Sequence, residues 1–294
     1  MIDNASLFNN LDHLTVKNKD NGKCFTKTKR LDRIEELLMN SSFTFMKKAG
    51  LFYAFSQIPF NDLNDDTLII SSHVDFRKGT KKCFSDTTGK KKVIGTYDNS
   101  ATNAAIVELM LHEELPKNTL VVFTGDEEVN ARGAAAVVNF VWELGINASC
   151  IVLDVTEEGY KAKAAFSIEN AYCDDALLRK VIDWMVKQDE KYFFVPAEEK
   201  QKKNELVVQM LPKEYVSDTV AETDESEEYG NKGIKCFSFC LPTKLMDPDG
   251  RFAPDNDPEE AMHSCKGLKI RRKSFVGYTK ALAGLINYLN VRGR

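Results

Sequence analysis

The sequence predicts an α/β protein, built as a three-layer α/β/α sandwich around a mixed, largely parallel central sheet. Two observations predict this fold. Apolar runs alternate along the chain with amphipathic stretches, and these runs are too uniformly apolar to have one face in water. Such runs are typical of strands buried on both faces, and their alternation with helices favours parallel pairing.

Four β-rich apolar runs predict the strands of the sheet. They cover residues 67–72, 119–124, 150–155 and 234–241. Their lengths of six to eight residues fit strands better than buried helices, which are longer. A further short strand is expected at residues 206–210.

Helical spacing of apolar residues predicts the segments between the strands. The predicted helices cover residues 31–48, 100–114, 131–144, 174–187 and 274–289. Ser100 is the expected N-cap of the second, because a serine hydroxyl accepts a hydrogen bond from the first turn. Gly145 is expected to end the third helix, because glycine tolerates the left-handed conformation found there.

Three segments show no clear period. Residues 76–96 form a loop whose cations lie between residues 77 and 92, and we expect a solvated loop with no assigned role. Residues 190–230 and 242–262 are expected to be excursions at the rim of a site, because neither is long enough for a second domain. Residues 1–294 are therefore expected to form a single domain.

Composition and charge exclude several classes of partner. The formal net charge is -4, so nothing global favours nucleic acid or an anionic membrane. The N-terminal residues lack the pattern of a signal peptide, and no apolar stretch reaches the roughly 18 residues of a transmembrane helix. Seven scattered cysteines indicate free thiols in a reducing compartment, so the cytoplasm is the expected location.

Metal-binding side chains follow the predicted strands at their carboxyl ends. His73 and Asp75 end the first strand, Glu127 and Glu128 follow the second, and the third carries Asp154. In open α/β sheets, ligands bind beyond the carboxyl ends of the strands. The sequence therefore predicts a polar site at this edge of the sheet.

Two further residues complete the predicted site. Asp98 lies at a loop–helix junction between the first two strands, and the fourth strand leads to His263 within Met262–Ser264. Histidine nitrogens and carboxylate oxygens are both zinc ligands, although such mixed sites also accept cobalt or manganese. A site for one or more divalent metal ions is expected.

The spacing of the acidic residues indicates separate roles. Alternation along a strand directs His73 and Asp75 to the same face, so His73 can bind a metal while Asp75 orients its other ring nitrogen. Adjacent Glu127 and Glu128 are most simply one general base and one ligand. Asp98 is placed to bridge two metal ions.

The ordered set His-x-Asp, Asp-Asn, Glu-Glu, Asp and Met-His-Ser resembles the co-catalytic di-zinc peptidase superfamily, clan MH. The resemblance spans roughly residues 65–290. It implies Glu127 as the base and a cis peptide bond between Asp98 and Asn99. It also implies two zinc ions, one held by His73, Asp98 and Asp154 and the other by Asp98, Glu128 and His263.

Chain spacing favours the compact aminopeptidase-like branch of that superfamily. Only 25 positions separate His73 from Asp98, which is too short for the domain that tetrahedral and glutamyl aminopeptidases insert there. The 109 positions from Asp154 to His263 are too few for the full lid of the carboxypeptidase and deacylase branch. Residues 222–224 also favour an aminopeptidase-like C-terminal half.

The resulting hypothesis is a metal-dependent aminopeptidase that removes N-terminal residues from peptides with a metal-activated water. One alternative is a carboxypeptidase or an N-acyl amino-acid deacylase that uses the same site. A second alternative is a non-catalytic binding protein that retains the fold. The preferred side chain, the native metal and the oligomeric state are left open by the sequence.

Overall fold

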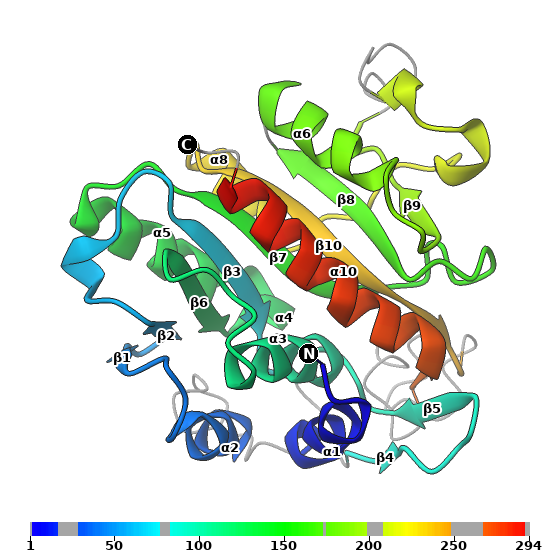
Figure 1. The fold of residues 1–294 in the computed structure, drawn as a ribbon, viewed down its shortest axis with the longest axis horizontal. Helices are drawn as coiled ribbons and strands as arrows, with labels where there is room; N and C mark the ends of the chain where they lie inside the picture. Colours follow the sequence, from blue (N-terminus) through cyan, green and yellow to red (C-terminus); the bar gives the residue numbers. More distant parts are fainter. Residues whose placement is uncertain are drawn as a thin grey trace.

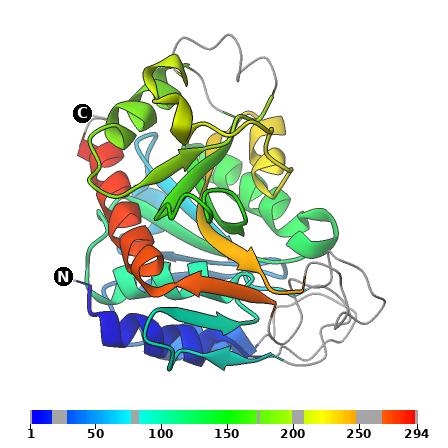
Figure 2. The same cartoon turned by 90° about the vertical axis from the view of Figure 1, so that its right-hand side faces the viewer.

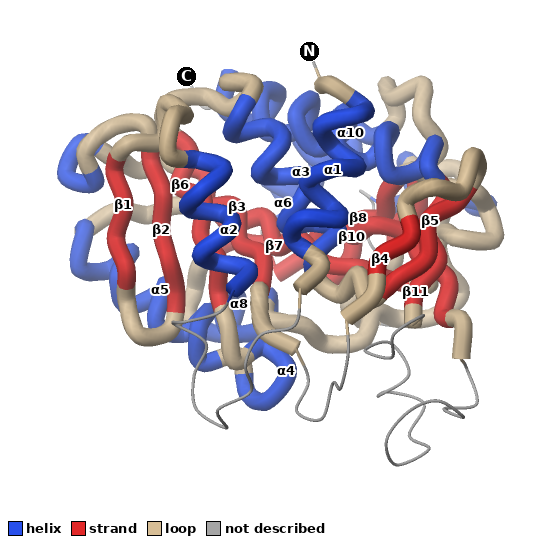
Figure 3. Tube along the Cα trace, turned by 90° about the horizontal axis from the view of Figure 1, so that it is seen from below, coloured by secondary structure: helices blue, strands red, loops and turns tan. Residues whose placement is uncertain are grey.

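A computed structural model describes residues 2–16, 29–76, 83–172, 175–198, 208–247 and 267–291. Figure 1 shows one twisted sheet crossing the molecule, with helices on both of its faces. The predicted three-layer α/β fold is confirmed. In Figure 3 the strands lie between a layer containing α1, α2, α3 and α10 and a layer containing α5 and α8.

Eleven strands pair in the order β1-β2-β6-β3-β7-β10-β11-β5-β4, and β8 branches from β10 to β9. The central strands β6, β3, β7 and β10 are mutually parallel, whereas the strands joined to them at either side are antiparallel. The strand bounds are β1 Phe45–Lys48, β2 Phe52–Ser56, β3 Leu68–His73, β4 Ser85–Asp86, β5 Lys92–Gly95, β6 Thr119–Thr124, β7 Ser149–Thr156, β8 Phe166–Tyr172, β9 Tyr192–Phe194, β10 Lys235–Leu245 and β11 Leu268–Arg271.

The helices differ in how much of their surface is buried. Their bounds are α1 Asn4–Leu14, α2 Lys29–Leu38, α3 Ser100–Leu111, α4 Glu127–Asn130, α5 Arg132–Leu144, α6 Asp175–Met185, α8 Ser226–Asn231 and α10 Arg272–Val291, with single 3-10 turns at Phe60–Asp62, Val208–Met210 and Lys213–Tyr215. All of α3 except Leu111 is buried, because the sheet, α1, α2 and α10 surround it. In contrast, α5 keeps one face exposed, on which Trp142 lies beside polar residues.

The core divides into two clusters, one on each face of the sheet. The larger cluster joins the sheet to α1, α2, α3, α6 and α10. The smaller one joins β2, β3, β6, β7 and β10 to α5 and α8. Strand residues alternate between the two clusters, as the period of two in a strand requires. Ile70 contributes to the first, for example, and Ile69 to the second.

The four predicted strands are confirmed as β3, β6, β7 and β10. The helices predicted at residues 100–114, 131–144, 174–187 and 274–289 are confirmed as α3, α5, α6 and α10, and Gly145 ends α5 with a φ of 69°. The N-cap prediction was wrong by one residue. Asn99 precedes α3, and the Ser100 hydroxyl donates back to the Thr96 carbonyl at 3.1 Å.

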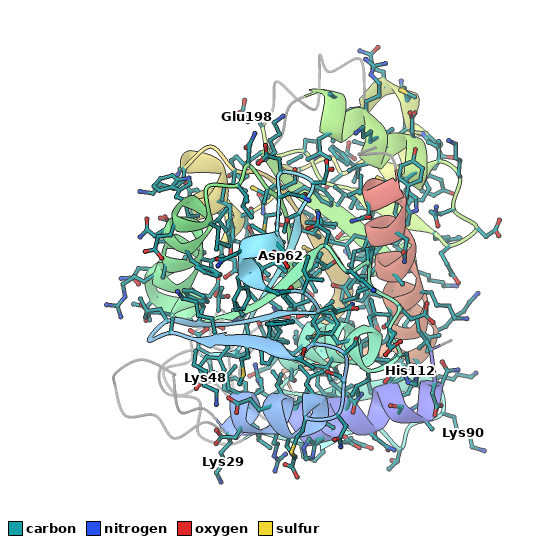
Figure 4. The ribbon with its side chains drawn as sticks, turned by 60° about the vertical axis from the view of Figure 1, so that its left-hand side comes forward. Lys29, Lys48, Asp62, Lys90, His112 and Glu198 are labelled. Atoms are coloured by element: carbon teal, nitrogen blue, oxygen red, sulfur yellow. The ribbon has the colours of Figure 1, made fainter. Side chains whose placement is uncertain are left out.

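The helix predicted over residues 31–48 was wrong in its second half. The helix α2 ends at Leu38, where the Ser41 hydroxyl donates to the Leu38 carbonyl at 2.8 Å and accepts from the backbone of Phe43. A serine that bonds nearby backbone groups in this way competes with helix continuation. The chain then forms β1, which pairs with β2 at the edge of the sheet. Figure 4 labels Lys29 and Lys48 at the outer ends of these two elements.

Two further expectations are corrected. Residues 208–210 lie within the strand expected at 206–210 but form a 3-10 turn. Two residues later the chain reaches Pro212, which has no N–H to donate to a sheet. The segment 76–96 is not a loop throughout, because β4 and β5 pair there and β5 also joins β11. Figure 2 shows this hairpin beside α1. The cations of residues 77–82 lie outside the described residues.

The two expected rim segments contain more regular structure than predicted. Segment 190–230 includes β9, two 3-10 turns and most of α8, and β10 continues to Leu245 within segment 242–262.

Of the described helices, none combines the length and apolar character needed to cross a membrane. No disulfide bond joins any two of the described cysteines, Cys83, Cys150, Cys236 and Cys240.

Candidate metal centre

The parallel strands β3, β6 and β7 bring their carboxyl ends to one edge of the sheet. His73 is the last residue of β3 and lies opposite Thr124, the last residue of β6. Asp154 lies near the end of β7, on the face that His73 also uses. The His73 side chain is buried, with an exposed fraction of 1% for the residue. The topology therefore places a buried imidazole beside carboxylates from neighbouring elements.

Short distances surround the imidazole of His73. Its Nε2 atom lies 3.1 Å from Asp98 Oδ1 and 3.8 Å from Asp154 Oδ1. Its Nδ1 atom lies 3.4 Å from Asp75 Oδ1. The two ring nitrogens thus face different carboxylates, the arrangement in which one nitrogen binds a metal and the other is oriented by an acid.

The loop that carries Asp98 is fixed to the ligand-bearing strands by amide side chains. Asn99 Nδ2 donates to the Leu153 carbonyl at 2.7 Å, next to Asp154 in the chain. Asn103 Nδ2, one turn further along α3, donates to the His73 carbonyl at 2.8 Å. The peptide bond between Asp98 and Asn99 is cis, as the resemblance implied. Backbone contacts therefore set the position of Asp98 relative to both strands.

The acidic pair Glu127 and Glu128 begins the short helix α4 directly after β6. The preceding residue, Asp126, has a φ of 60° and an ion pair with Arg132 of α5. The backbone N–H of Glu128 donates to Asp75 Oδ2 at 3.3 Å. These contacts turn the chain sharply at the end of β6 and hold the acidic pair over the edge of the sheet.

Burial, hydrogen bonds and neighbouring charges together shift the pKa values of this cluster. Burial alone would lower the pKa of His73, but Asp154, Asp75 and Asp98 outweigh it and raise the pKa well above its usual value. Burial and the neighbouring carboxylates raise the pKa of Glu127 to about 10, although His73 opposes this shift. Burial likewise raises the pKa of Asp154 to about 7, against the effect of His73. The carboxylates of the cluster favour a positive charge among them, and His73 supplies it when its imidazole is protonated.

The donor set fits divalent metal ions. Ligand atoms of His73, Asp98 and Asp154 lie within 4.8 Å of one another, and those of His73, Glu127 and Glu128 form a second such group. Nitrogen and carboxylate oxygen together suit zinc and similar ions. A bound cation would lower the pKa values of Glu127 and Asp154, because its positive charge favours their ionised forms, and it would displace the proton from His73. His263, predicted as a ligand, lies outside the described residues.

The structure adds a buried cation that the sequence did not reveal. Arg30 of α2 has an exposed fraction of 0%, and its guanidinium lies 4.1 Å from the centre of the Phe76 ring. Burial lowers the pKa of Arg30 to about 10, opposed by the charges of Cys83, Asp98, Asp75 and Glu128. In sequence, Arg30 belongs to a charged helix and resembles a solvated residue. Only the packing of α2 beneath the site shows its position.

A second buried group near the site is Glu225, immediately before α8. Its carboxyl accepts hydrogen bonds from Ser71 of β3 and Thr124 of β6. Burial raises its pKa, opposed by these two hydrogen bonds and by the charge of His73. Its neighbour Asp224 accepts from Ser238 of β10 at 2.6 Å. Periodicity does not identify Glu225, because its partners lie more than 100 positions away in the sequence.

No family model matches the sequence, and no curated protein is similar enough to count as a relative. Solved structures are similar in fold. The TET1 peptidase of Pyrococcus horikoshii, described as assembling into a tetrahedron or an octahedral shell, has a TM-score of 0.62 and 12% identity over 96% of this chain and 99% of its own. The aminopeptidase PepT of Bacillus cereus has a TM-score of 0.58 and 9% identity over 98% and 99%.

A third similar structure is LapB of Legionella pneumophila, with a TM-score of 0.58 and 14% identity over 99% of this chain and 73% of its own. At these identities the likeness shows the fold alone. At that level the predicted resemblance to the aminopeptidase-like branch is confirmed, because the likeness spans nearly the whole chain.

Proposed function

We propose that the chain is a single-domain metallopeptidase that hydrolyses N-terminal peptide bonds. The observation that carries this proposal is the grouping of His73, Asp98 and Asp154, with ligand atoms within 4.8 Å of one another beside Glu127 and Glu128. The fold shared with structures named as aminopeptidases supports the peptide substrate. Fold by itself does not define a reaction, so the chemistry is argued from the residues.

The proposed ligands are His73, Asp98 and Asp154 for one metal ion, and Asp98, Glu128 and His263 for the other. When bound, such ions polarise the scissile carbonyl and lower the pKa of water toward neutrality. Asp75 orients the imidazole of His73 through the ring nitrogen that faces it at 3.4 Å. Zinc is the proposed native metal, with cobalt or manganese as substitutes that the donor set also accepts.

Glu127 is the proposed general base. Its carboxylate oxygen lies within 4.8 Å of ligand atoms of His73 and Glu128, so it is close to where a metal-bound water would lie. In the proposed reaction Glu127 takes a proton from the attacking water and delivers it to the leaving amine. Glu128, the next residue, is left to bind metal.

The alternative of a carboxypeptidase or deacylase requires a cation that reaches the substrate carboxylate. Arg30 is the cation whose charge interacts with Asp75, Asp98 and Glu128, and its side chain is fully buried. It therefore does not present its charge to a substrate. Among the described residues, which do not include the cations of residues 77–82, this observation favours the aminopeptidase reaction over the alternative.

The test is a substrate screen on protein stripped with a chelator and reloaded with Zn²⁺, Co²⁺ or Mn²⁺. Aminoacyl chromogenic substrates, dipeptides, tripeptides and N-acyl amino acids are compared with each metal. We expect metal-dependent cleavage of substrates with a free amino terminus. Cleavage of only N-acylated substrates would establish the alternative, and metal binding without any hydrolysis would support the non-catalytic binding protein.

The role of Glu127 is tested by Glu127→Gln, with Glu143→Gln on the exposed face of α5 as the matched control. Loss of a general base typically lowers kcat by about 100- to 10,000-fold. We expect that loss in Glu127→Gln with bound metal retained, and wild-type kcat in the control. Wild-type activity in Glu127→Gln would exclude this assignment.

A further inference from the structure

The buried carboxyl group of Glu225 connects the two strands that carry most of the site. Glu225 Oε1 accepts from the Ser71 hydroxyl at 2.5 Å, and Oε2 accepts from the Thr124 hydroxyl at 2.7 Å. The exposed fraction of Glu225 is 1%, and those of Ser71 and Thr124 are 0%. Each oxygen of one carboxyl group is therefore bonded to a different strand, out of contact with water.

Both partners lie close to the predicted catalytic residues, Ser71 within β3 and Thr124 at the end of β6. Ser71 lies two positions before His73, so the two side chains share one face of β3. Thr124 is opposite His73 in the parallel register and precedes Glu127 by only three positions. The distance between the two hydroxyls is thus coupled to the distance between His73 and the Glu127–Glu128 turn.

Other contacts hold the Ser71 hydroxyl and the start of α8 in place. Tyr229, one turn into α8, donates its hydroxyl to Ser71 Oγ at 3.0 Å. Asp224 accepts from the backbone N–H of Ser226 at 2.8 Å and from the Ser238 hydroxyl of β10. The start of α8 is therefore bonded to three strands of the sheet, β3, β6 and β10.

We propose that Glu225 is a positioning residue of the metal centre, which fixes the carboxyl ends of β3 and β6 so that His73 and Glu128 reach their metal ligand positions. The inference rests on the proposed function, because it assigns Glu225 to that same site. Glu225 touches neither metal nor substrate in this role, and acts through Ser71 and Thr124.

A contribution to folding stability alone would not explain why the carboxyl group of Glu225 is buried here. A carboxyl removed from water costs free energy even when its oxygens accept hydrogen bonds, and apolar side chains of similar size often fill such sites at less cost. The two strands are already joined by the backbone hydrogen bonds of their parallel pairing. What the carboxyl adds is a defined separation of the two hydroxyls at the strand ends, because its two oxygens are rigidly spaced.

The test compares zinc affinity and steady-state kinetics in Glu225→Ala and Thr124→Val with those of the wild-type protein. Thr124→Val keeps the shape of its side chain and removes only the hydroxyl that Glu225 accepts. Changes to groups that orient a metal ligand typically weaken metal binding about 10- to 100-fold. We expect a loss of that size in Glu225→Ala, with kcat lowered and KM changed less than about twofold, and a smaller loss in Thr124→Val.

The control is Glu108→Ala, which removes a buried carboxyl that accepts hydrogen bonds from α1, away from the site. It should lower the melting temperature and leave zinc affinity at the wild-type value. A folded Glu225→Ala protein with wild-type zinc affinity and kcat would overturn the proposal. If Glu225→Ala does not fold, unchanged zinc affinity in Thr124→Val overturns it instead.

Zinc affinity is measured by competition with a chromophoric chelator, so this experiment needs no substrate. A wild-type protein that binds zinc and cleaves no peptide would exclude the proposed peptidase, whereas the affinities of the variants would still decide the role of Glu225.

Discussion

The protein buries carboxylates in two regions that satisfy them in different ways. At the junction of α1 and α3, Glu108 accepts hydrogen bonds from the backbone N–H of Asp3, from Ser6 and from Asn10, at 3.1, 2.7 and 3.0 Å. His112, at the C-terminal end of α3 and labelled in Figure 4, lies 3.0 Å from the same carboxylate. At the carboxyl edge of the sheet, carboxylates instead crowd around one imidazole.

The difference lies in what completes each cluster. Neutral donors from one short helix are enough for Glu108, and its contacts tie α1 to α3. At the sheet edge burial raises the pKa values of Glu127 and Asp154, and the charge of Asp98 raises both further, which means that like charges are held together at a cost. Crowded carboxylates of this kind need bound cations to balance their charge. The hydrogen bonds within the protein are enough to satisfy Glu108.

The largest expected effect comes from removing a charge at the sheet edge with Asp98→Asn. This residue is the proposed bridge between two metal ions, so zinc affinity should fall by at least about 100-fold, at the upper limit for residues that only orient ligands. The melting temperature in chelator should not fall, because one of several repelling charges is gone. Zinc titrations and thermal melts check both effects, and a zinc-induced rise in melting temperature equal to that of the wild type would contradict the bridge.

The second prediction concerns the turn that carries Glu127 and Glu128. Gly133 packs against that turn, and a Cβ at this position would lie 2.3 Å from the carbonyl oxygen of Gly125 and 2.8 Å from that of Leu51. Gly133→Ala should therefore displace the turn and lower the free energy of unfolding by about 3 kcal/mol, the upper range for overpacking. Zinc affinity should fall as well. Urea unfolding and zinc titration measure the two effects, and the open-space position Gly50→Ala is the control.

The third prediction concerns the region around Glu108, at the junction of α1 and α3. Glu108→Ala removes the acceptor of Ser6 and Asn10 and should lower the free energy of unfolding by about 2 kcal/mol, the cost of leaving buried donors without a partner. Urea unfolding gives this value. Zinc affinity should stay at the wild-type level, and a change in it would show that the two regions are coupled through α3.

The fourth prediction is a pH dependence that Glu169 of β8 produces. Burial raises the pKa of Glu169 from 4.5 to about 8, opposed by a hydrogen bond from Ser167. Between pH 4.5 and 8 the folded state therefore keeps a proton that the unfolded state has lost. Stability should fall as the pH rises through this window, on the order of 1 kcal/mol per pH unit, and change no further on this account outside it.

Glu169→Gln cannot ionise, so its stability in chelator should decline less than that of the wild type between pH 5 and 8. Thermal melts across this range provide the comparison. If the two proteins show the same slope, the buried carboxyl is not the source of the pH dependence.

Local patterns predicted much of this fold because burial on both faces leaves uniformly apolar runs. The strands β3, β6, β7 and β10 and the helices α3, α5, α6 and α10 were identified in this way. The strands β1, β2, β4, β5, β8, β9 and β11 were not predicted. Several of them are short, and β5 pairs with β11 more than 170 positions away.

The same division applies to the candidate site. Residues that directly follow the strong strands, His73, Asp75, Glu127 and Glu128, were located because parallel strands end at a common edge. Arg30 and Glu225 were not. Each is a charged residue whose side chain reaches the site only because a helix packs against the sheet there.

The sequence by itself determined the alternation of strands and helices, the parallel core and the acidic and histidine residues at its carboxyl edge, because these depend on periodicity and chain order. Tertiary structure alone decided which buried groups surround those residues. Contacts such as those of Arg30 with Phe76 and Glu225 with Thr124 join segments far apart in the chain. They form only when the layers pack, and no local pattern encodes them.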